Sequence, residues 1–169
     1  MPDHSTIHCM TSYMAWADDV MLTGAEQLSD ADLFAPREAL FKNITGTFDH
    51  TLVVQEIFHA HLEGRDHVHH SRYRDEPLAF AEVARRHRKM NDHFVEVARC
   101  STEVDLKEKI SFTFVGDGEG VMTREEILMH LVNHSTYHRG FVSTLLYPLK
   151  VKVAANDLTV FLRDVWTDM

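Results

Sequence analysis

The stretch His130-Leu131-Val132-Asn133-His134-Ser135-Thr136-Tyr137-His138-Arg139-Gly140 decides the expected fold, because it places His134 and His138 four residues apart inside a strongly helical segment. Residues at this spacing lie on one face of a helix, about one turn apart, so two imidazoles can converge on one cation. Borderline-soft divalent metals such as zinc and nickel favour neutral imidazole ligands. The pair indicates a metal clamp on a helix. The alternative is a chance spacing, because the chain contains 13 histidines.

The helix around this stretch has clear end signals. Thr123 and Glu126 match the Thr-x-x-Glu capping box, and Pro148 ends the run. Between them apolar residues recur at the helical period: Ile127, Leu131, Phe141 and Leu145. The sequence therefore predicts a helix from Thr123 to about Pro148.

Three other long segments show the same three- and four-residue apolar period. The first runs from about Ser5 to Leu28, where residues 29–32 end it before a loop through Pro36. The second is capped by Asn43 or Thr45 and stops at Gly64. The third covers residues 80–97. A short C-terminal helix is predicted to open at 156–157 and to run through Val165.

The connections between these helices differ in character. Residues 65–77 are polar and without periodicity, which is typical of a crossover loop. Residues 110–114 alternate as a strand would, with glycines behind them, so a small hairpin near 109–122 is a further hypothesis. Four long helices with two longer connections predict an all-α protein, a four-helix bundle with longer crossover loops. We expect a single domain over residues 1–169.

The composition argues against several classes of partner. Seventeen basic residues against 26 acidic ones give a net charge of −9, which repels phosphate backbones. The basic run at 85–89 is typical of a solvated helix face. Cys9 and Cys100 are the two cysteines, and no Cys-x-x-Cys occurs, which favours a reducing cytoplasm. No stretch approaches the ~18 apolar residues of a membrane span. We expect a cytoplasmic protein without nucleic-acid or membrane partners.

The metal clamp needs a third ligand from another helix. His130, His134 and His138 share one stripe, but His130 and His138 are separated by roughly 12 Å along the axis, whereas two ligand atoms on one zinc ion lie within about 4 Å of each other. The candidates on the other helices are His50, His61, His87 and His93.

These candidates differ in their surroundings. His87 is flanked by two arginines, which would bring positive charge towards a cation. His61 lies near a helix end, where a capping or surface role is an alternative. His50 is in register with Val54 and Ile57, so it can face the bundle interior, either as a ligand or as a hydrogen-bonded core histidine.

Five segments of the chain resemble the DinB family, also called the DinB/YfiT-like metalloenzymes. The segments are 13–18, 46–50, 62–64, 130–140 and 156–162. Asp18 stands where the family usually has asparagine. Phe141 replaces a common glutamine, and Gln55 and Phe58 replace aspartate and tryptophan; these departures concern the substrate more than the metal.

The resemblance implies a four-helix bundle that binds a divalent ion, often as a homodimer. Carried over residue by residue, its three-histidine metal site falls on His50, His134 and His138. Members of the family include metal-dependent transferases that use low-molecular-weight thiols. We therefore expect conjugation of a small-molecule thiol to an electrophilic substrate, in stress or detoxification.

Two alternatives stay open. The first is metal-activated hydrolysis of a small substrate. The second is a non-catalytic metal-binding stress protein, with a loose second site formed by the histidines between 59 and 70: His59, His61, His67, His69 and His70. That histidine-rich stretch also fits a solvated loop.

Five further residues are candidates for supporting roles. A metal-bound imidazole usually donates its other nitrogen to a carboxylate or a carbonyl, so Asp49 and Asp157 are candidate partners of the ligands. Tyr137 and Arg139 are placed to approach a substrate. Trp16 is expected in the core, at a dimer interface or over the pocket.

Overall fold

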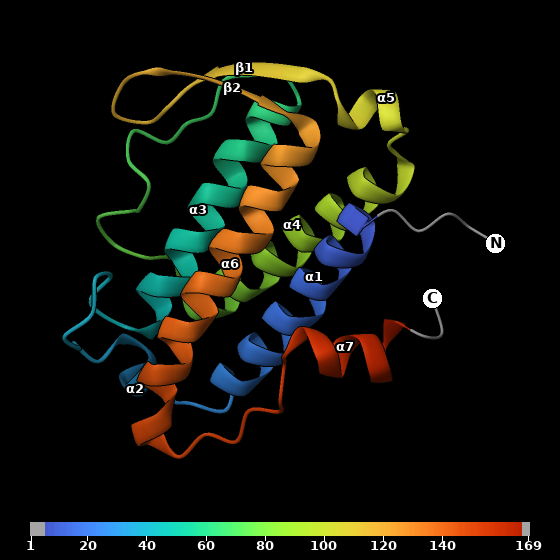
Figure 1. Cartoon of the computed structure of the whole chain (residues 1–169). Coiled ribbons are helices and arrows are strands. Elements are labelled where there is room, and N and C mark those ends of the chain that lie inside the picture. Colours follow the sequence, from blue (N-terminus) through green and yellow to red (C-terminus); the bar gives the residue numbers. More distant parts are fainter. Residues whose placement is uncertain (1–5, 167–169) are drawn as a thin grey trace.

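The computed structural model of the chain describes residues 6–166 and consists mainly of helices (Figure 1). Four helices are long: α1 (Thr6–Ala25), α3 (Ile44–Leu62), α4 (Phe80–Cys100) and α6 (Arg124–Leu146). The shorter elements are α2 (Asp30–Phe34), α5 (Glu103–Leu106), the 3-10 turn η1 (Tyr147–Leu149) and α7 (Leu158–Asp164). The strands β1 (Lys109–Thr113) and β2 (Glu119–Thr123) form one antiparallel hairpin. Within the described residues, no helix combines the length and the apolar character that crossing a membrane requires.

The four long helices form the predicted bundle. Helix α1 packs against α4 and α6, and α3 packs against α6 and α4, so each long helix contacts neighbours on two sides. Figure 1 shows α3 and α6 side by side along most of their lengths. This pairing brings α3, which carries His50, next to the part of α6 that carries His134 and His138.

Apolar side chains fill the two ends of the bundle, and a polar layer separates them. The hairpin end holds one cluster, which includes Met14, Phe58, Phe94 and Leu131. The α2 end holds the other, which includes Leu22, Leu52, Phe80 and Leu146. Each long helix contributes one or two buried polar residues to a layer between these two sets: Asp18, Thr51, His87, Asn91, Ser135 and Arg139. We call these six residues the polar layer.

The local signals that end or begin elements explain most boundaries. Thr123 and Glu126 form the predicted capping box at the start of α6. The hairpin pairs Lys109 with Thr123, within one residue of the predicted range, and Gly116 and Gly118 take left-handed φ angles at its turn. The predicted short C-terminal helix is α7. The predicted start of the first helix at Ser5 lies outside the described residues.

Two short helices differ from the prediction. Residues 29–32 were expected to end the first helix, which the structure ends at Ala25, and instead they begin α2. The Ser29 side chain accepts a hydrogen bond from the backbone N–H of Asp32, so a cap signal was interpreted as a stop signal. Helix α5 was not predicted; a capping box between Thr102 and Asp105 stabilises its single turn.

Candidate metal centre

Three histidines from two adjacent helices converge in the bundle. His50 projects from α3, and His134 and His138 project from successive turns of α6. The Nε2 atoms of His50 and His134 lie 3.2 Å apart, and the ring of His138 lies 4.7 Å from that of His50 and 4.5 Å from that of His134. One ligand nitrogen from each residue lies within 4.8 Å of the others. We call these residues the histidine triad, and it could hold a metal ion.

The spacing of the nitrogens fits a shared ion. Two metal–nitrogen bonds of about 2.1 Å place their nitrogens about 3.0 to 3.4 Å apart when the angle between them is octahedral to tetrahedral. The 3.2 Å separation of the two Nε2 atoms falls inside that interval. His130, one turn before His134, instead packs against Phe58 with ring centroids 4.8 Å apart, and it is not part of the triad.

A backbone carbonyl orients His50. The Nδ1–H of His50 donates to the carbonyl oxygen of Arg72 at 2.6 Å, which leaves the lone pair of Nε2 directed at His134. Metal-bound imidazoles are commonly held in this way. The predicted partner Asp49 serves the same purpose indirectly: it accepts a hydrogen bond from Arg74 at 2.5 Å and so holds the loop that carries Arg72. The prediction that Asp49 bonds directly to a ligand histidine is therefore wrong.

An aromatic ring covers the other face of His50. Phe41 stacks on the imidazole with ring centroids 4.0 Å apart and an angle of 14° between the planes. Gly46 makes this approach possible, because a Cβ at this position would lie 2.3 Å from the carbonyl oxygen of Phe41. The glycine therefore keeps the loop before α3 against the triad.

Burial keeps the triad neutral. Desolvation lowers the pKa of His134 to about 3, with further lowering by the neighbouring histidines, and lowers the pKa of His138 to about 4. Desolvation also lowers the pKa of His50. At neutral pH all three imidazoles are therefore unprotonated on one nitrogen, as metal coordination requires. The buried Nδ1 of His138 has no hydrogen-bond partner among the described residues, which fits a site that accepts a cation.

Two cavities meet at His50, and the larger one also reaches the other two histidines of the triad. The smaller has a volume of about 360 Å³ and the larger about 620 Å³, and both are lined by Phe41, His50 and Arg72. The smaller cavity has a mixed lining, in which five side chains are polar or charged besides Arg72: Lys42, Asn43, Asp49, Arg74 and Asp75. Apolar side chains line much of the larger cavity: Val54, Ile57, Phe58, Phe114, Val115 and Met122. His130, His134, His138 and Tyr137 also face this larger cavity.

Of the other residues predicted to have supporting roles, some lie beside the cavities and others lie away from them. Tyr137 lines the larger cavity, as expected of a residue that approaches a substrate. Arg139 instead points into the polar layer, where it pairs with Asp18 at 2.8 Å. Asp157 lies at the N-cap of α7, which packs on α1. Trp16 is half-buried and packs against Phe161 of α7, with ring centroids 5.6 Å apart, and it lines neither cavity.

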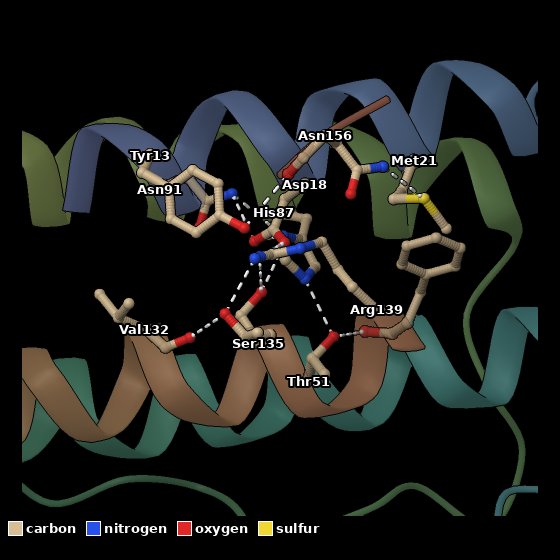
Figure 2. Close-up of polar contacts among 12 residues, drawn as sticks. Tyr13, Asp18, Met21, Thr51, His87, Asn91, Val132, Ser135, Arg139 and Asn156 are labelled. Carbon is tan, nitrogen blue, oxygen red and sulfur yellow. Dashed lines mark hydrogen bonds and ion pairs between the residues drawn. The ribbon is translucent and has the colours of Figure 1, made fainter. Parts of the chain in front are cut away.

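The polar layer holds α6 against α1, on the side of α6 away from the triad. This layer was not predicted from the sequence. Figure 2 shows the side chains of Asp18, Ser135 and Arg139 pointing toward one another. The Asp18 carboxylate accepts hydrogen bonds from Ser135 at 2.5 Å, Arg139 at 2.8 Å and Asn91 at 3.1 Å. Ser135 and Arg139 directly follow the two α6 ligand candidates in sequence. Their bonds therefore fix the rotation of α6 that aims both histidines at α3.

His87 belongs to this layer and not to the triad. Thr51 donates its hydroxyl hydrogen to the Phe48 carbonyl, so it accepts the Nε2–H of His87 at 2.9 Å. The other nitrogen of His87 accepts from Asn91. Desolvation lowers the pKa of His87, in agreement with this neutral form. The one available signal for the layer was an aspartate, Asp18, inside the apolar stripe of the first helix.

The histidines between 59 and 70 do not form one group. His61 stacks on Phe112 with ring centroids 4.7 Å apart and lies near His67. His69 bonds to Glu56 at 2.8 Å. His59 faces His93 of α4 instead. The prediction that these five histidines form one loose metal site is therefore wrong.

Comparison with known proteins places the chain in a family. The model of the DinB family matches residues 1–164. The chain belongs to the DinB family. A crystal structure of a DinB-like protein from Bacillus cereus ATCC 10987 superposes with a TM-score of 0.61 at 22% identity, over 85% of this chain and 91% of that one. At that identity the likeness shows a shared DinB-like helical fold. The comparison with curated proteins finds no match.

Proposed function

We propose that His50, His134 and His138 bind one divalent ion, zinc or nickel, and that this DinB-family protein conjugates a low-molecular-weight thiol to a small electrophile. Three neutral imidazoles leave at least one coordination position for a reactant, which is typical of catalytic rather than structural sites. A bound ion of this kind stabilises a thiolate, the nucleophilic form of a thiol, at neutral pH.

The observation that carries the proposal is the pair of cavities that meet at His50. A conjugation needs room for two reactants beside one ion. The smaller cavity, with Lys42, Arg72 and Arg74 in its mixed lining, suits the charged groups that small biological thiols carry. The apolar cavity suits the body of an electrophile. Holding both reactants at the triad supplies the proximity that a two-substrate reaction requires.

Hydrolysis ranks second because the cavities offer little for it. A hydrolase gains from a free general base beside the ion. The carboxylates that line the two cavities, among the described residues, are Asp49 and Asp75. Asp49 is paired with Arg74, and Asp75 lies on the polar loop beyond it. Storage or sensing of the ion under stress is the third candidate, and it requires no second cavity.

A cytoplasmic location and a homodimer belong to the same proposal. Reduced thiol substrates are available in the cytoplasm, and Cys9 and Cys100 are both free thiols here. The dimer follows from the resemblance to the family and stays a prediction. Gel filtration at high protein concentration tests it, and elution as a monomer would contradict it.

The decisive experiment combines metal, thiol and electrophile. Protein purified without an affinity tag is stripped with a chelator, reloaded with zinc or nickel, and incubated with cysteine-derived thiols and a chromogenic haloarene. We expect thiol consumption and adduct formation in the loaded protein only, and loss of both in His134→Ala. Turnover of an ester substrate without any thiol would instead favour hydrolysis. Full metal loading with neither reaction across the panel would favour the storage role.

A further inference from the structure

A second group of metal-binding side chains lies on the other side of α3. His59 lies in the last turn of α3, Glu63 is the C-cap residue four positions later, and His93 faces them from α4. One ligand atom from each residue lies within 4.8 Å of the others. The Nε2 atom of His59 is 3.0 Å from a carboxylate oxygen of Glu63, and the rings of His59 and His93 are 4.3 Å apart. We call these three residues the outer cluster.

The outer cluster is separate from the histidine triad. His59 follows His50 by nine residues, which is about 13 to 14 Å along the helix axis and half a turn around it. The two histidines therefore point to opposite sides of α3. The triad faces α6, whereas the outer cluster faces α4, so one ion cannot serve both.

The outer cluster is partly built into the protein. The side chain of His59 is 20% exposed, and both imidazoles contact the ring of Phe94, a fully buried residue of the core. Two imidazoles and one carboxylate are a donor set that zinc, copper and nickel accept, and the carboxylate offsets part of the cation's charge. Because the ligands come from two helices, binding would link α3 to α4.

Arg65 occupies the cluster in the structure described here. Its guanidinium donates to Nδ1 of His59 at 3.1 Å and pairs with Glu63 at 2.5 Å. This cation competes with a metal for the same carboxylate. The Arg65 side chain is half exposed, so it can turn into solvent when an ion binds.

We propose that His59, Glu63 and His93 form a second divalent-metal site, which ties α3 to α4 and binds its ion less tightly than the triad because Arg65 must be displaced. The second site does not depend on the proposed reaction. With this second site, each chain would bind two ions, and each ion would be held by a different pair of helices.

The first test counts ions. Untagged, chelator-stripped protein is titrated with zinc against a chromophoric chelator. We expect two ions per wild-type chain, one bound more weakly. His93→Ala and Glu63→Gln should each lose the weaker ion, and His50→Ala should lose the tighter one. His61→Ala is the matched control, since His61 packs on Phe112, and it should keep both ions.

The second test uses Arg65 and the helix link. Arg65→Gln should tighten the weaker site several-fold, because it removes the competing cation. Zinc should raise the melting temperature of His50→Ala but not that of His50→Ala combined with Glu63→Gln. With one Cu²⁺ loaded into His50→Ala, electron paramagnetic resonance should show coupling to two nitrogens, and adding His93→Ala to that variant should remove one of them. A wild-type stoichiometry of one, or a second ion that survives both His93→Ala and Glu63→Gln, would overturn the proposal.

Discussion

At the scale of single residues, the triad depends on which nitrogen each imidazole presents. His50 is fixed by one backbone carbonyl, that of Arg72, and His134 and His138 are fixed by the helix that carries them. Residue type alone identifies a histidine but not the direction of its lone pair. The local geometry therefore decides that His50 joins the triad while His130, on the same stripe as His134, packs on Phe58.

Alanine at any of the three triad positions should severely lower occupancy of the tight site. Removing a ligand should weaken binding by more than the ~10- to 100-fold that follows loss of a ligand's hydrogen-bond partner. His130→Ala is the control and should bind normally. Bound metal per chain after dialysis against a weak chelator measures the effect. Full occupancy of that site in His50→Ala, with loss in His130→Ala, would refute the assignment.

Asp18 should be the most sensitive position of the polar layer. Asp18→Ala leaves Arg139, which is 5% exposed, as a buried charge without its carboxylate, and should destabilise the fold by about 3 to 5 kcal/mol. Asp18→Asn keeps some hydrogen bonds and should cost less. The neighbouring Asp19 offers a control, because its pair with Arg88 is on the surface and Asp19→Ala should change stability by no more than about 1 kcal/mol. Urea unfolding separates these outcomes, and equal effects of Asp18→Ala and Asp19→Ala would contradict the role of the layer.

At the scale of elements, sequence patterns predicted the long helices well and the loops poorly. The apolar period and the Thr123 capping box define α6, and spacing along it predicts that His134 and His138 meet. The contribution of Arg72 could not be predicted, because a backbone carbonyl carries no signal in residue type. The partners of Asp18 lie more than 70 positions away in the chain, so local spacing does not reveal them.

The loop between α3 and α4 gives a test at this scale. Arg74 ties the loop to Asp49 at 2.5 Å and to Glu56 at 2.7 Å, and so positions the Arg72 carbonyl. Arg74→Ala should lower metal affinity at the triad by roughly tenfold, in the range expected when the partner of a ligand is lost. Asp66→Ala, an exposed change on the same loop, should have no effect. Unchanged affinity in Arg74→Ala would show that the loop is held by other contacts.

At the scale of the whole molecule, the lowered histidine pKa values make stability depend on pH. An unfolded histidine titrates near 6.5, whereas His134 and His138 titrate at about 3 and about 4 when folded. The unfolded chain therefore binds more protons between these values. Stability is fully present above pH 6.5 and is lost as the pH falls towards 4 and 3.

Metal-free protein should accordingly unfold at lower urea concentrations as the pH is reduced from 6.5 to 4. His134→Phe should show a shallower decline, because one of the shifted groups is removed. Histidines with the free imidazole pKa of about 6.5 would begin to release a metal near pH 6. Since protons compete weakly for the folded triad, we expect the ion to stay bound below pH 6. Release that follows the free imidazole pKa would contradict this.

The polar layer also determines which helix alignments the bundle permits. Sliding one long helix by a turn would move Asp18, Asn91 or Arg139 into an apolar end, where each would lose its hydrogen-bond partners. The layer therefore fixes the axial alignment of the four helices. It also separates most of the two apolar ends, although Met90 packs against both. Phe94 and Leu146 belong to different apolar clusters, so the effects of replacing each by alanine on the free energy of unfolding should add. A protein engineer could therefore repack one end without redesigning the other.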